Sequence, residues 1–331
     1  MSNLKQLEAL SEIKSLAQDD LNKMDLAIKA RLSSKEQLVQ DITYHIISSG
    51  GKRLRPALLI LIAKLFGYNG QRHINLAAAV EFIHTATLLH DDVVDHSSLR
   101  RGKLTANQNW DNKSSILVGD FLFSQSFLLM SEDSDVKVLE ILSKAAAIIA
   151  EGEVKQLSSI ANLDLILDDY LRVISAKTAE LFAAACQVGA VIADADNHLQ
   201  ESMYHFGLNL GMAFQIIDDV MDYMADKASM GKNIGDDFKE AKVTLPIILA
   251  FENSNLDEKE FWNKAINQKN QQEKDFEIAL DIFSKYEVID KCFDMAKEYA
   301  LKAQVHIEQT PDHEIKNILI KMLSFSVNRD F

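Results

Sequence analysis

Apolar residues recur at every third or fourth position along almost the whole chain, which is the period of an α-helix. This spacing predicts helices at 2–31, 35–49, 57–66, 76–95, 114–130, 135–158, 169–193 and 198–224. Pro56 and Pro246 are each expected to open a helix, and the last third of the chain is also helical. Residues 96–112 and 225–243 are polar and are expected to be loops. No segment alternates as a strand would, so the fold class is all-α.

The helices between about residues 76 and 224 are apolar on most faces, which places them in the middle of a bundle. The chain has 331 residues with 12 Gly and 3 Pro, and no stretch resembles a flexible linker. We therefore expect residues 1–331 to form a single domain. The first residues lack the apolar stretch of a signal peptide, and the longest apolar run is too short to span a bilayer. These features predict a soluble, cytoplasmic protein.

The formal net charge is −14, which argues against nucleic acid as the main partner, because such binding depends on basic residues that neutralise phosphates. A small anionic substrate is still compatible with this charge, since a local basic pocket or bound metal ions can attract it. The two cysteines, Cys186 and Cys292, do not form a CxxC motif and are expected to be reduced core residues.

Two clusters of aspartates each follow an apolar run: Asp91, Asp92 and Asp95, and Asp218, Asp219 and Asp222. On a helix, Asp91 and Asp95 project from nearly the same face, where they repel each other. One such cluster could be a solvated helix end. The second copy in the same setting favours a site for hard divalent cations, and Mg²⁺ commonly bridges carboxylates to a substrate phosphate.

Basic and polar residues follow a complementary pattern. A glycine-initiated loop at 50–56 carries Lys52, Arg53 and Arg55 into a helix, which is typical of an anion site but also of an ordinary helix start on the surface. His84 lies on the helical face of Asp91, although a histidine in this position is commonly a packed core residue. The other candidates are Arg100, Arg101, Lys177, Thr178, Gln215, Lys232 and Lys242.

Taken in order, these motifs resemble those of the trans-isoprenyl diphosphate synthases, over about residues 45 to 250. The resemblance rests on Gly51-Lys52, Arg55, His84, Asp91-Asp92-Val93-Val94-Asp95, Arg100-Arg101-Gly102, Gly119-Asp120, Lys177-Thr178, Phe214-Gln215, Asp218-Asp219-Val220-Met221-Asp222 and Gly231-Lys232. The chain is most similar to the long-chain bacterial branch, the octaprenyl diphosphate synthases. This implies a helical bundle of the isoprenoid synthase type with a central tunnel, and a homodimer.

The resemblance also implies roles for these residues. Mg²⁺, three ions per active site with substrate bound, would be held by Asp91, Asp95 and Asp218, with Asp92, Asp219 and Asp222 in support. An allylic diphosphate, farnesyl diphosphate by expectation, would contact Arg100, Lys177, Thr178, Gln215 and Lys232. Isopentenyl diphosphate would contact Lys52, Arg55, His84 and Arg101. The residues expected to be catalytic are Asp91, Asp92, Asp95, Lys177, Gln215 and Asp218.

Product length depends on the wall of the tunnel. Ala86 and Thr87 are small and precede Asp91, so the first part of the tunnel is expected to be open. Phe123, Phe127 and Met130 recur on one face of the helix after Asp120. This stripe, or Met130 itself, is expected to form the floor of the tunnel, with Phe127 and Met130 as determinants of chain length. These side chains could equally be core or dimer contacts. The expected product is octaprenyl diphosphate, for quinone side chains, with contact to a membrane when the product leaves.

Several alternatives stay open. A shorter- or longer-chain synthase, such as a geranylgeranyl or nonaprenyl diphosphate synthase, would carry the same motifs. A non-catalytic partner subunit of a heteromeric synthase could lose an Asp cluster or Lys52 and Arg55, whereas this chain retains them. A terpene cyclase would not need the isopentenyl diphosphate anchors. A helical interaction protein with acidic patches would bind no diphosphate.

Overall fold

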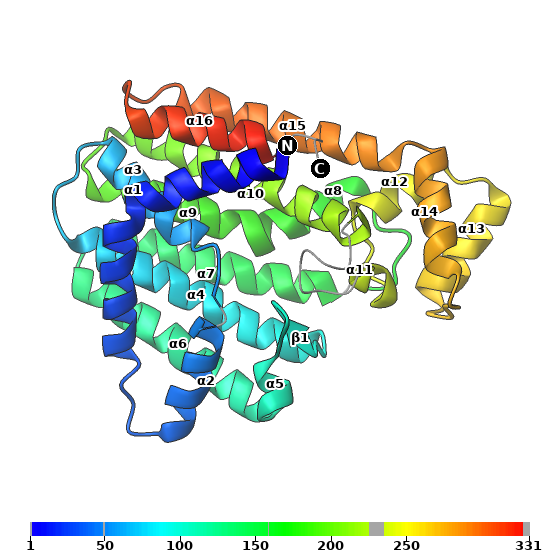
Figure 1. Cartoon of the computed structure of the whole chain (residues 1–331), viewed down its shortest axis with the longest axis horizontal. Coiled ribbons are helices and arrows are strands. Elements are labelled where there is room, and N and C mark those ends of the chain that lie inside the picture. The colour runs from blue at the N-terminus through cyan, green and yellow to red at the C-terminus, as the bar shows by residue number, and fades with distance from the viewer. Residues whose placement is uncertain (1, 49, 158, 225–234, 327–331) are drawn as a thin grey trace.

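The computed structural model describes residues 2–48, 50–157, 159–224 and 235–326, and they are mainly helical (Figure 1). The first half contains α1 (Ser2–Arg31), α2 (Gln37–Ser48), α3 (Leu54–Leu65), α4 (Arg72–Val94), α5 (Ala106–Asn109), α6 (Asn112–Asp133) and α7 (Val136–Leu157). The second half contains α8 (Leu167–Ile174), α9 (Glu180–Ile192), α10 (Asn197–Met224), α11 (Asp236–Lys239), α12 (Leu245–Asn253), α13 (Leu256–Trp262), α14 (Asp275–Lys285), α15 (Val288–Ile307) and α16 (Glu314–Ser326). The predicted all-α class is confirmed.

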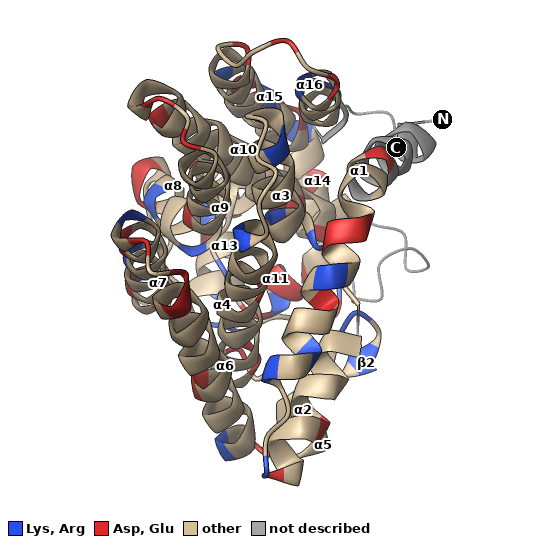
Figure 2. Cartoon of the chain, turned by 90° about the vertical axis from the view of Figure 1, so that its left-hand side faces the viewer, with Lys and Arg blue, Asp and Glu red and all other residues tan. Residues whose placement is uncertain are grey.

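The helices stack side by side around a buried middle. α10 packs between α9 and α15, α3 packs on α9, and α4 packs on α6. In Figure 2, α4 lies between α1 and α6, both of which it contacts. The residues of α9 are nearly all buried, because its sequence is apolar on every face. The apolar centre predicted for residues 76–224 is therefore found in α4, α9 and α10.

Gly207 and Gly211 allow α10 to pack closely against the backbone of Ala179 and Phe182, at the start of α9. A Cβ atom at Gly207 would lie 2.4 Å from the backbone oxygen of Phe182, and one at Gly211 would lie 2.5 Å from the Cα of Ala179. Only glycine permits this approach of two backbones. The close packing directs the end of α10, with its Asp cluster, toward the segment that carries Lys177.

That segment is a π-helical turn, Ser175–Ala179, inserted between α8 and α9. Its wider winding contains Lys177 and Thr178, and the sequence pattern predicted a single uninterrupted helix here. Turns of this kind are rare in proteins and are frequent at functional sites. A second π-helical turn, Asn263–Asn267, follows α13.

The starts of α3 and α6 are among those that differ from the prediction. α3 begins at Leu54, so Pro56 lies third in the first turn, where the missing N–H would have no helical partner anyway. α6 begins at Asn112 because the side chain of Asp111 accepts a hydrogen bond from the N–H of Ser114 at 2.7 Å. Pro246 lies in the first turn of α12, as predicted.

The predicted loop at 96–112 contains a small antiparallel hairpin, β1 (Leu99–Arg100) with β2 (Lys103–Leu104). Arg101 and Gly102 both have positive φ, 53° and 74°, which is typical of a two-residue hairpin turn. Two-residue strands are too short to leave an alternating pattern, so the prediction of a plain loop is wrong here for lack of a signal.

Of the described helices, α6 is the one that is long and apolar enough to cross a membrane, a test that core helices of folded proteins also pass. One face of α6 packs on α4. The opposite face exposes Ile116, Leu117, Phe127 and Leu128, each at least 42% accessible. An exposed apolar stripe of this length is typical of a contact surface.

Candidate active site

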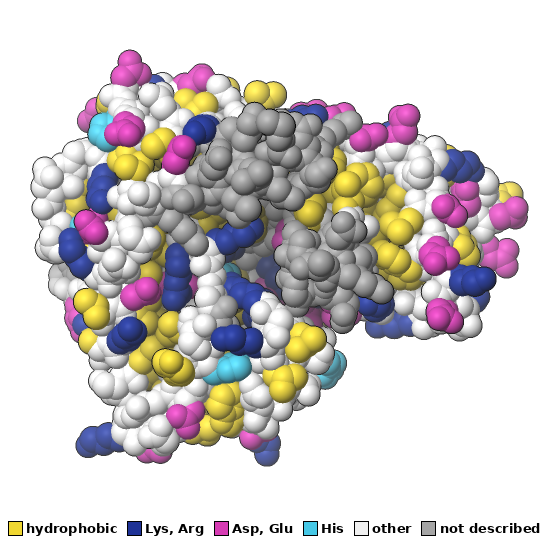
Figure 3. All heavy atoms as spheres, viewed as in Figure 1, with side chains coloured by type: hydrophobic (Ala, Val, Ile, Leu, Met, Phe, Trp, Pro, Cys, Tyr) yellow, Lys and Arg dark blue, Asp and Glu magenta, His cyan; other side chains and the backbone are white. Residues whose placement is uncertain are grey.

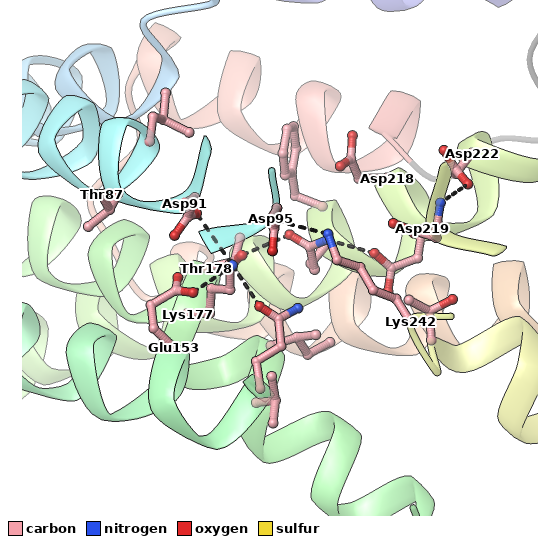
Figure 4. Close-up of a pocket in the computed structure, with 18 of the residues that line it drawn as sticks. Thr87, Asp91, Asp95, Glu153, Lys177, Thr178, Asp218, Asp219, Asp222 and Lys242 are labelled. Atoms are coloured by element: carbon pink, nitrogen blue, oxygen red, sulfur yellow. Dashed lines mark hydrogen bonds and ion pairs between the residues drawn. The ribbon is translucent and has the colours of Figure 1, made fainter. Parts of the chain in front are cut away.

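A cavity of about 620 Å³ lies among the ends of α4 and α10, the start of α3 and the π-helical turn. Asp91, Asp95, Asp218, Asp219 and Asp222 line it, so both predicted clusters contribute to one space. Figure 4 shows the carboxylates of α4 and α10 facing this space, with Lys177 and Lys242 between them. Residues that are far apart in the sequence therefore line one cavity.

Lysines contact the carboxylates of α4 that face the cavity. The Nζ of Lys177 lies 3.3 Å from Asp91 and 2.7 Å from Glu153, and the Nζ of Lys242 lies 2.9 Å from Asp95. Burial disfavours the charged lysines, but the carboxylates outweigh it and raise the pKa of both Lys177 and Lys242. Burial and the charge of Asp91 raise the pKa of Glu153 to about 7.

Asp92 has a different environment from its neighbours. It is buried and does not line the cavity. Its carboxylate accepts hydrogen bonds from Nε and Nη2 of Arg100 at 2.9 and 2.7 Å, while the side-chain amide of Asn107 donates to its backbone oxygen. Burial raises the pKa of Asp92, although the bonds from Arg100 oppose this. Asp92 therefore anchors Arg100, which does line the cavity.

A chain of hydrogen bonds connects the second cluster to the π-helical turn. Asp219 is buried and accepts bonds from the hydroxyl of Tyr170 at 2.6 Å and from Nε2 of Gln215 at 2.7 Å. Thr178 donates in turn to Oε1 of Gln215 at 2.7 Å. Burial raises the pKa of Asp219 to about 7, with contributions from Asp218 and Asp222. These hydrogen bonds fix the end of α10 relative to Lys177.

The carboxylates form an open arrangement. Among the residues that the structure describes, no three side chains of His, Cys, Asp or Glu converge into a closed metal site. Asp91, Asp95 and Asp218 instead face a shared space from two helices. Mg²⁺ usually keeps several waters and is held by one or two carboxylates together with phosphate oxygens, so this donor set fits it.

The other end of the cavity is basic. Arg55 and His84 line it, with 3.4 Å between Nη1 of Arg55 and Nε2 of His84. The Nε of Arg55 is buried and has no hydrogen-bond partner. Burial lowers the pKa of Arg55 to about 10, and burial together with the charge of Arg55 lowers that of His84 well below its usual value. A buried guanidinium with an unused donor is suited to an anion.

Lys52 and Arg101 complete this basic end. The guanidinium of Arg101 lies against Gly51, where a Cβ atom would be only 3.0 Å from its Nη1. Arg53 also lines the cavity, but its guanidinium is bonded to the buried Glu81. Figure 3, viewed from the same side as Figure 1, shows Lys and Arg side chains gathered in a hollow near the centre of the molecule.

The predicted site residues differ in where the structure places them. Those that line the cavity are Lys52, Arg55, His84, Thr87, Asp91, Asp95, Arg100, Arg101, Lys177, Thr178, Gln215, Asp218, Asp219 and Asp222. Gly231 and Lys232 lie outside the described residues. Ala86 and Met130 are fully buried and Phe127 is 43% exposed, and none of the three lines this cavity.

Sequence reasoning missed Glu153 and Tyr170, and it noted Lys242 without assigning it a role. Lys242 could have been assigned to the site because it lies in the charged segment that follows the second Asp cluster. Glu153 and Tyr170 lie on α7 and α8, outside the motifs. Nothing in their local sequence indicates that they face the aspartates.

Comparison with known proteins agrees with the family that the sequence motifs indicated. The polyprenyl synthetase family matches residues 36–283. Octaprenyl diphosphate synthases of Haemophilus influenzae and Escherichia coli are each 40% identical, covering 98% and 97% of this chain and 98% and 99% of their own lengths. A polyprenyl synthase from Caulobacter crescentus CB15, solved with calcium and isoprenyl diphosphate, is 45% identical with a TM-score of 0.93 over 97% of this chain and 98% of its own.

A decaprenyl diphosphate synthase from Rhodobacter capsulatus is also similar in structure, with 44% identity and a TM-score of 0.92 over 96% of this chain and 98% of its own. The resemblance predicted from the motifs is confirmed, and so are the helical-bundle fold and the enzymatic class. The chain belongs to the polyprenyl synthetase family and is a long-chain trans-polyprenyl diphosphate synthase, a prenyltransferase.

Proposed function

We propose that this enzyme condenses isopentenyl diphosphate repeatedly onto farnesyl diphosphate, with Mg²⁺, to give octaprenyl diphosphate for quinone side chains. The observation that carries the proposal is that an acidic end and a basic end share one cavity of about 620 Å³. Two diphosphates can then bind a short distance apart, one through metal ions and the other directly through cations. The identity to octaprenyl diphosphate synthases supports the product length.

The acidic end is the proposed allylic site. Asp91, Asp95 and Asp218 would hold Mg²⁺, three ions with substrate bound, and Asp219 and Asp222 would orient the end of α10. When bound, these ions supply positive charge to the leaving diphosphate. Arg100, Lys177, Thr178, Gln215 and Lys232 would bind its oxygens, and the position of Lys242 adds this residue to the set.

The basic end is the proposed site of isopentenyl diphosphate, bound by Lys52, Arg55, His84 and Arg101. Burial and the charge of Arg55 lower the pKa of His84 well below its usual value, which favours the neutral ring. Its ring can therefore accept from a guanidinium or donate to phosphate without adding charge. The arginines supply the charge that the substrate needs.

The reaction follows from these positions. Cleavage of the allylic C–O bond moves negative charge onto the departing diphosphate, where Lys177 and Arg100 stabilise it. The double bond of isopentenyl diphosphate attacks the allylic carbon, a new C–C bond forms, and a proton passes to the departing diphosphate. Apolar side chains such as Leu88 and Phe214 also line the cavity and would exclude water from the cation.

The growing chain would leave the site past Thr87, which lines the cavity one turn before Asp91. Ala86, Phe127 and Met130 are the other proposed determinants of length. Burial of Met130 on α6, which packs on α4, supports a place for it beside a tail that follows α4.

A homodimer is proposed for the assembly. The exposed face of α6 with Ile116, Leu117 and Leu128 would be buried in it. We also propose that the enzyme is cytoplasmic and consists of one domain. It would contact the membrane only to release its product.

The test uses the purified full chain with isopentenyl diphosphate, farnesyl diphosphate and Mg²⁺, with the product length read by mass spectrometry. An octaprenyl product is expected. A geranylgeranyl or nonaprenyl product would overturn the chain length alone. Absence of any product would favour a non-catalytic partner subunit, and a cyclic hydrocarbon would favour a terpene cyclase. Parallel reactions with geranyl and geranylgeranyl diphosphates test the choice of primer.

A further inference from the structure

Two aromatic rings lie beneath cations at the basic end of the cavity. The Cζ of Arg55 is 4.3 Å from the centroid of the Phe182 ring, and the Nζ of Lys52 is 5.6 Å from that of Phe214. The two rings are themselves in contact, with centroids 5.6 Å apart. They come from α9 and α10, helices held together by the close approach at Gly207 and Gly211.

Arg55 differs from the neighbouring arginines in how it is held. Arg53 is bonded to Glu81, and Arg100 is bonded to Asp92. Among the described residues, no carboxylate forms an ion pair with Arg55, and its nearest polar side-chain contact is His84 at 3.4 Å. A ring face attracts a guanidinium without using any of its N–H groups. A carboxylate would occupy those donors and would compete with a diphosphate for them.

We propose that Phe182 is a positioning residue: its ring holds the guanidinium of Arg55 over the cavity by a cation–π interaction and leaves the N–H donors available for isopentenyl diphosphate. Phe214 does the same for Lys52, more weakly because the distance is longer. Phe182 is fully buried, so the ring is fixed by packing and can define where Arg55 lies. This inference rests on the proposed role of Arg55 in binding isopentenyl diphosphate.

The experiment replaces Phe182 with 3,4,5-trifluorophenylalanine, which keeps the shape of the ring but weakens the negative charge on its face. KM for isopentenyl diphosphate should rise about 3- to 30-fold, the range of a cation–π contact at a partly desolvated site. KM for the allylic substrate and kcat should each change by less than about 2-fold, since the ring contacts found among the described residues are with Arg55 and Phe214 rather than with the aspartates. An unchanged KM for isopentenyl diphosphate would overturn the proposal.

Matched substitutions separate the ring charge from packing. Phe182→Leu should raise KM for isopentenyl diphosphate at least as much as the fluorinated ring. Phe206 is a fully buried ring on α10 that contacts no cation among the described residues, so Phe206→Leu should not raise this KM. An equal increase in both variants would show a packing effect and overturn the proposal. Arg55→Gln tests the underlying site. If that variant leaves KM for isopentenyl diphosphate unchanged, the proposed function of Arg55 fails, whereas an effect at Arg55 without one at Phe182 overturns only the positioning role.

Discussion

The Nζ of Lys242 lies 2.9 Å from the carboxylate of Asp95, although the two residues are separated by 147 positions in the chain. Lys177 stands in the same relation to Asp91 at 3.3 Å. Each aspartate of α4 that faces the cavity is thus paired with a lysine, and each lysine also contacts a glutamate, Glu153 or Glu240. Metal ions must displace these ammonium groups, which can then bind the phosphate oxygens that arrive with the metal.

The first prediction concerns metal binding. Mg²⁺ alone should bind weakly, because it competes with Lys177 and Lys242 for the carboxylates. A non-reactive allylic thiolodiphosphate should bind at least about 10-fold more tightly with Mg²⁺ than without it, a difference of roughly 1.4 kcal/mol. Calorimetry of the purified enzyme, with each component added alone and together, measures this. Tight binding of Mg²⁺ in the absence of diphosphate would contradict the prediction.

The second prediction concerns Lys242. Lys242→Gln should lower kcat/KM for the allylic substrate by about 30- to 1000-fold, the usual cost of removing a positioned charge from a reacting group. Steady-state kinetics with varied farnesyl diphosphate would detect it. The matched control is Lys239→Gln on α11, an exposed lysine that does not line the cavity. A comparable loss in the control would indicate a general effect of net charge.

The third prediction concerns Tyr170, whose hydroxyl donates to the buried carboxylate of Asp219. Tyr170→Phe should destabilise the protein by about 1–3 kcal/mol, since one buried acceptor loses its partner. It should also lower kcat, because the end of α10 is less well fixed. Tyr204→Phe removes a similar bond to Glu180 away from the cavity and should affect only stability. Denaturant unfolding and kinetics on both variants provide the comparison.

The fourth prediction concerns product length. Thr87→Phe should shorten the product, because the new ring would project into the cavity one turn before Asp91. Met130→Ala should lengthen it if Met130 forms the floor of the tunnel. Mass spectrometry of the extracted products measures both effects. An unchanged length with Met130→Ala would show that this residue is only a core contact.

The fifth prediction concerns pH and stability. Asp20 accepts a bond from Lys23 at 2.8 Å and pairs with Lys64 at 2.7 Å. Burial alone would raise the pKa of Asp20, but the two lysines outweigh it and lower the pKa to about 2. The pKa of an aspartate in the unfolded chain is about 4. Ionised Asp20 therefore stabilises the folded state above about pH 4, and this stabilisation is lost between about pH 4 and pH 2.

Asp20→Asn should therefore cost about 1–2 kcal/mol at pH 7, after allowance for solvent screening, and the deficit should shrink as the pH falls toward 3. Urea unfolding at pH 7, 5 and 3.5 gives the difference. Asp19→Asn changes an exposed neighbour and serves as the control. A deficit that stays constant over this range would rule out the charge of Asp20 as its cause.

The helical spacing of apolar residues was sufficient to predict the long helices, because each of them buries an apolar face that its own sequence defines. The shared face of Asp91 and Asp95 followed from helical geometry in the same way. The environment of Asp92 could not be predicted, since it depends on a hairpin whose strands have two residues each. The contact between Tyr170 and Asp219 could not be predicted either, because it arises from the packing of α8 on α10 rather than from any motif.

The π-helical turn at Ser175–Ala179 has a consequence for comparing relatives. It adds one residue to the winding, and the wider turn absorbs that residue locally between α8 and α9. Deleting a single residue there would restore a regular α-helix and change how Lys177 and Thr178 are presented to the cavity. In an alignment of related genes, a one-residue gap at this point would mark relatives whose Lys-Thr pair is held differently, even where every aspartate persists.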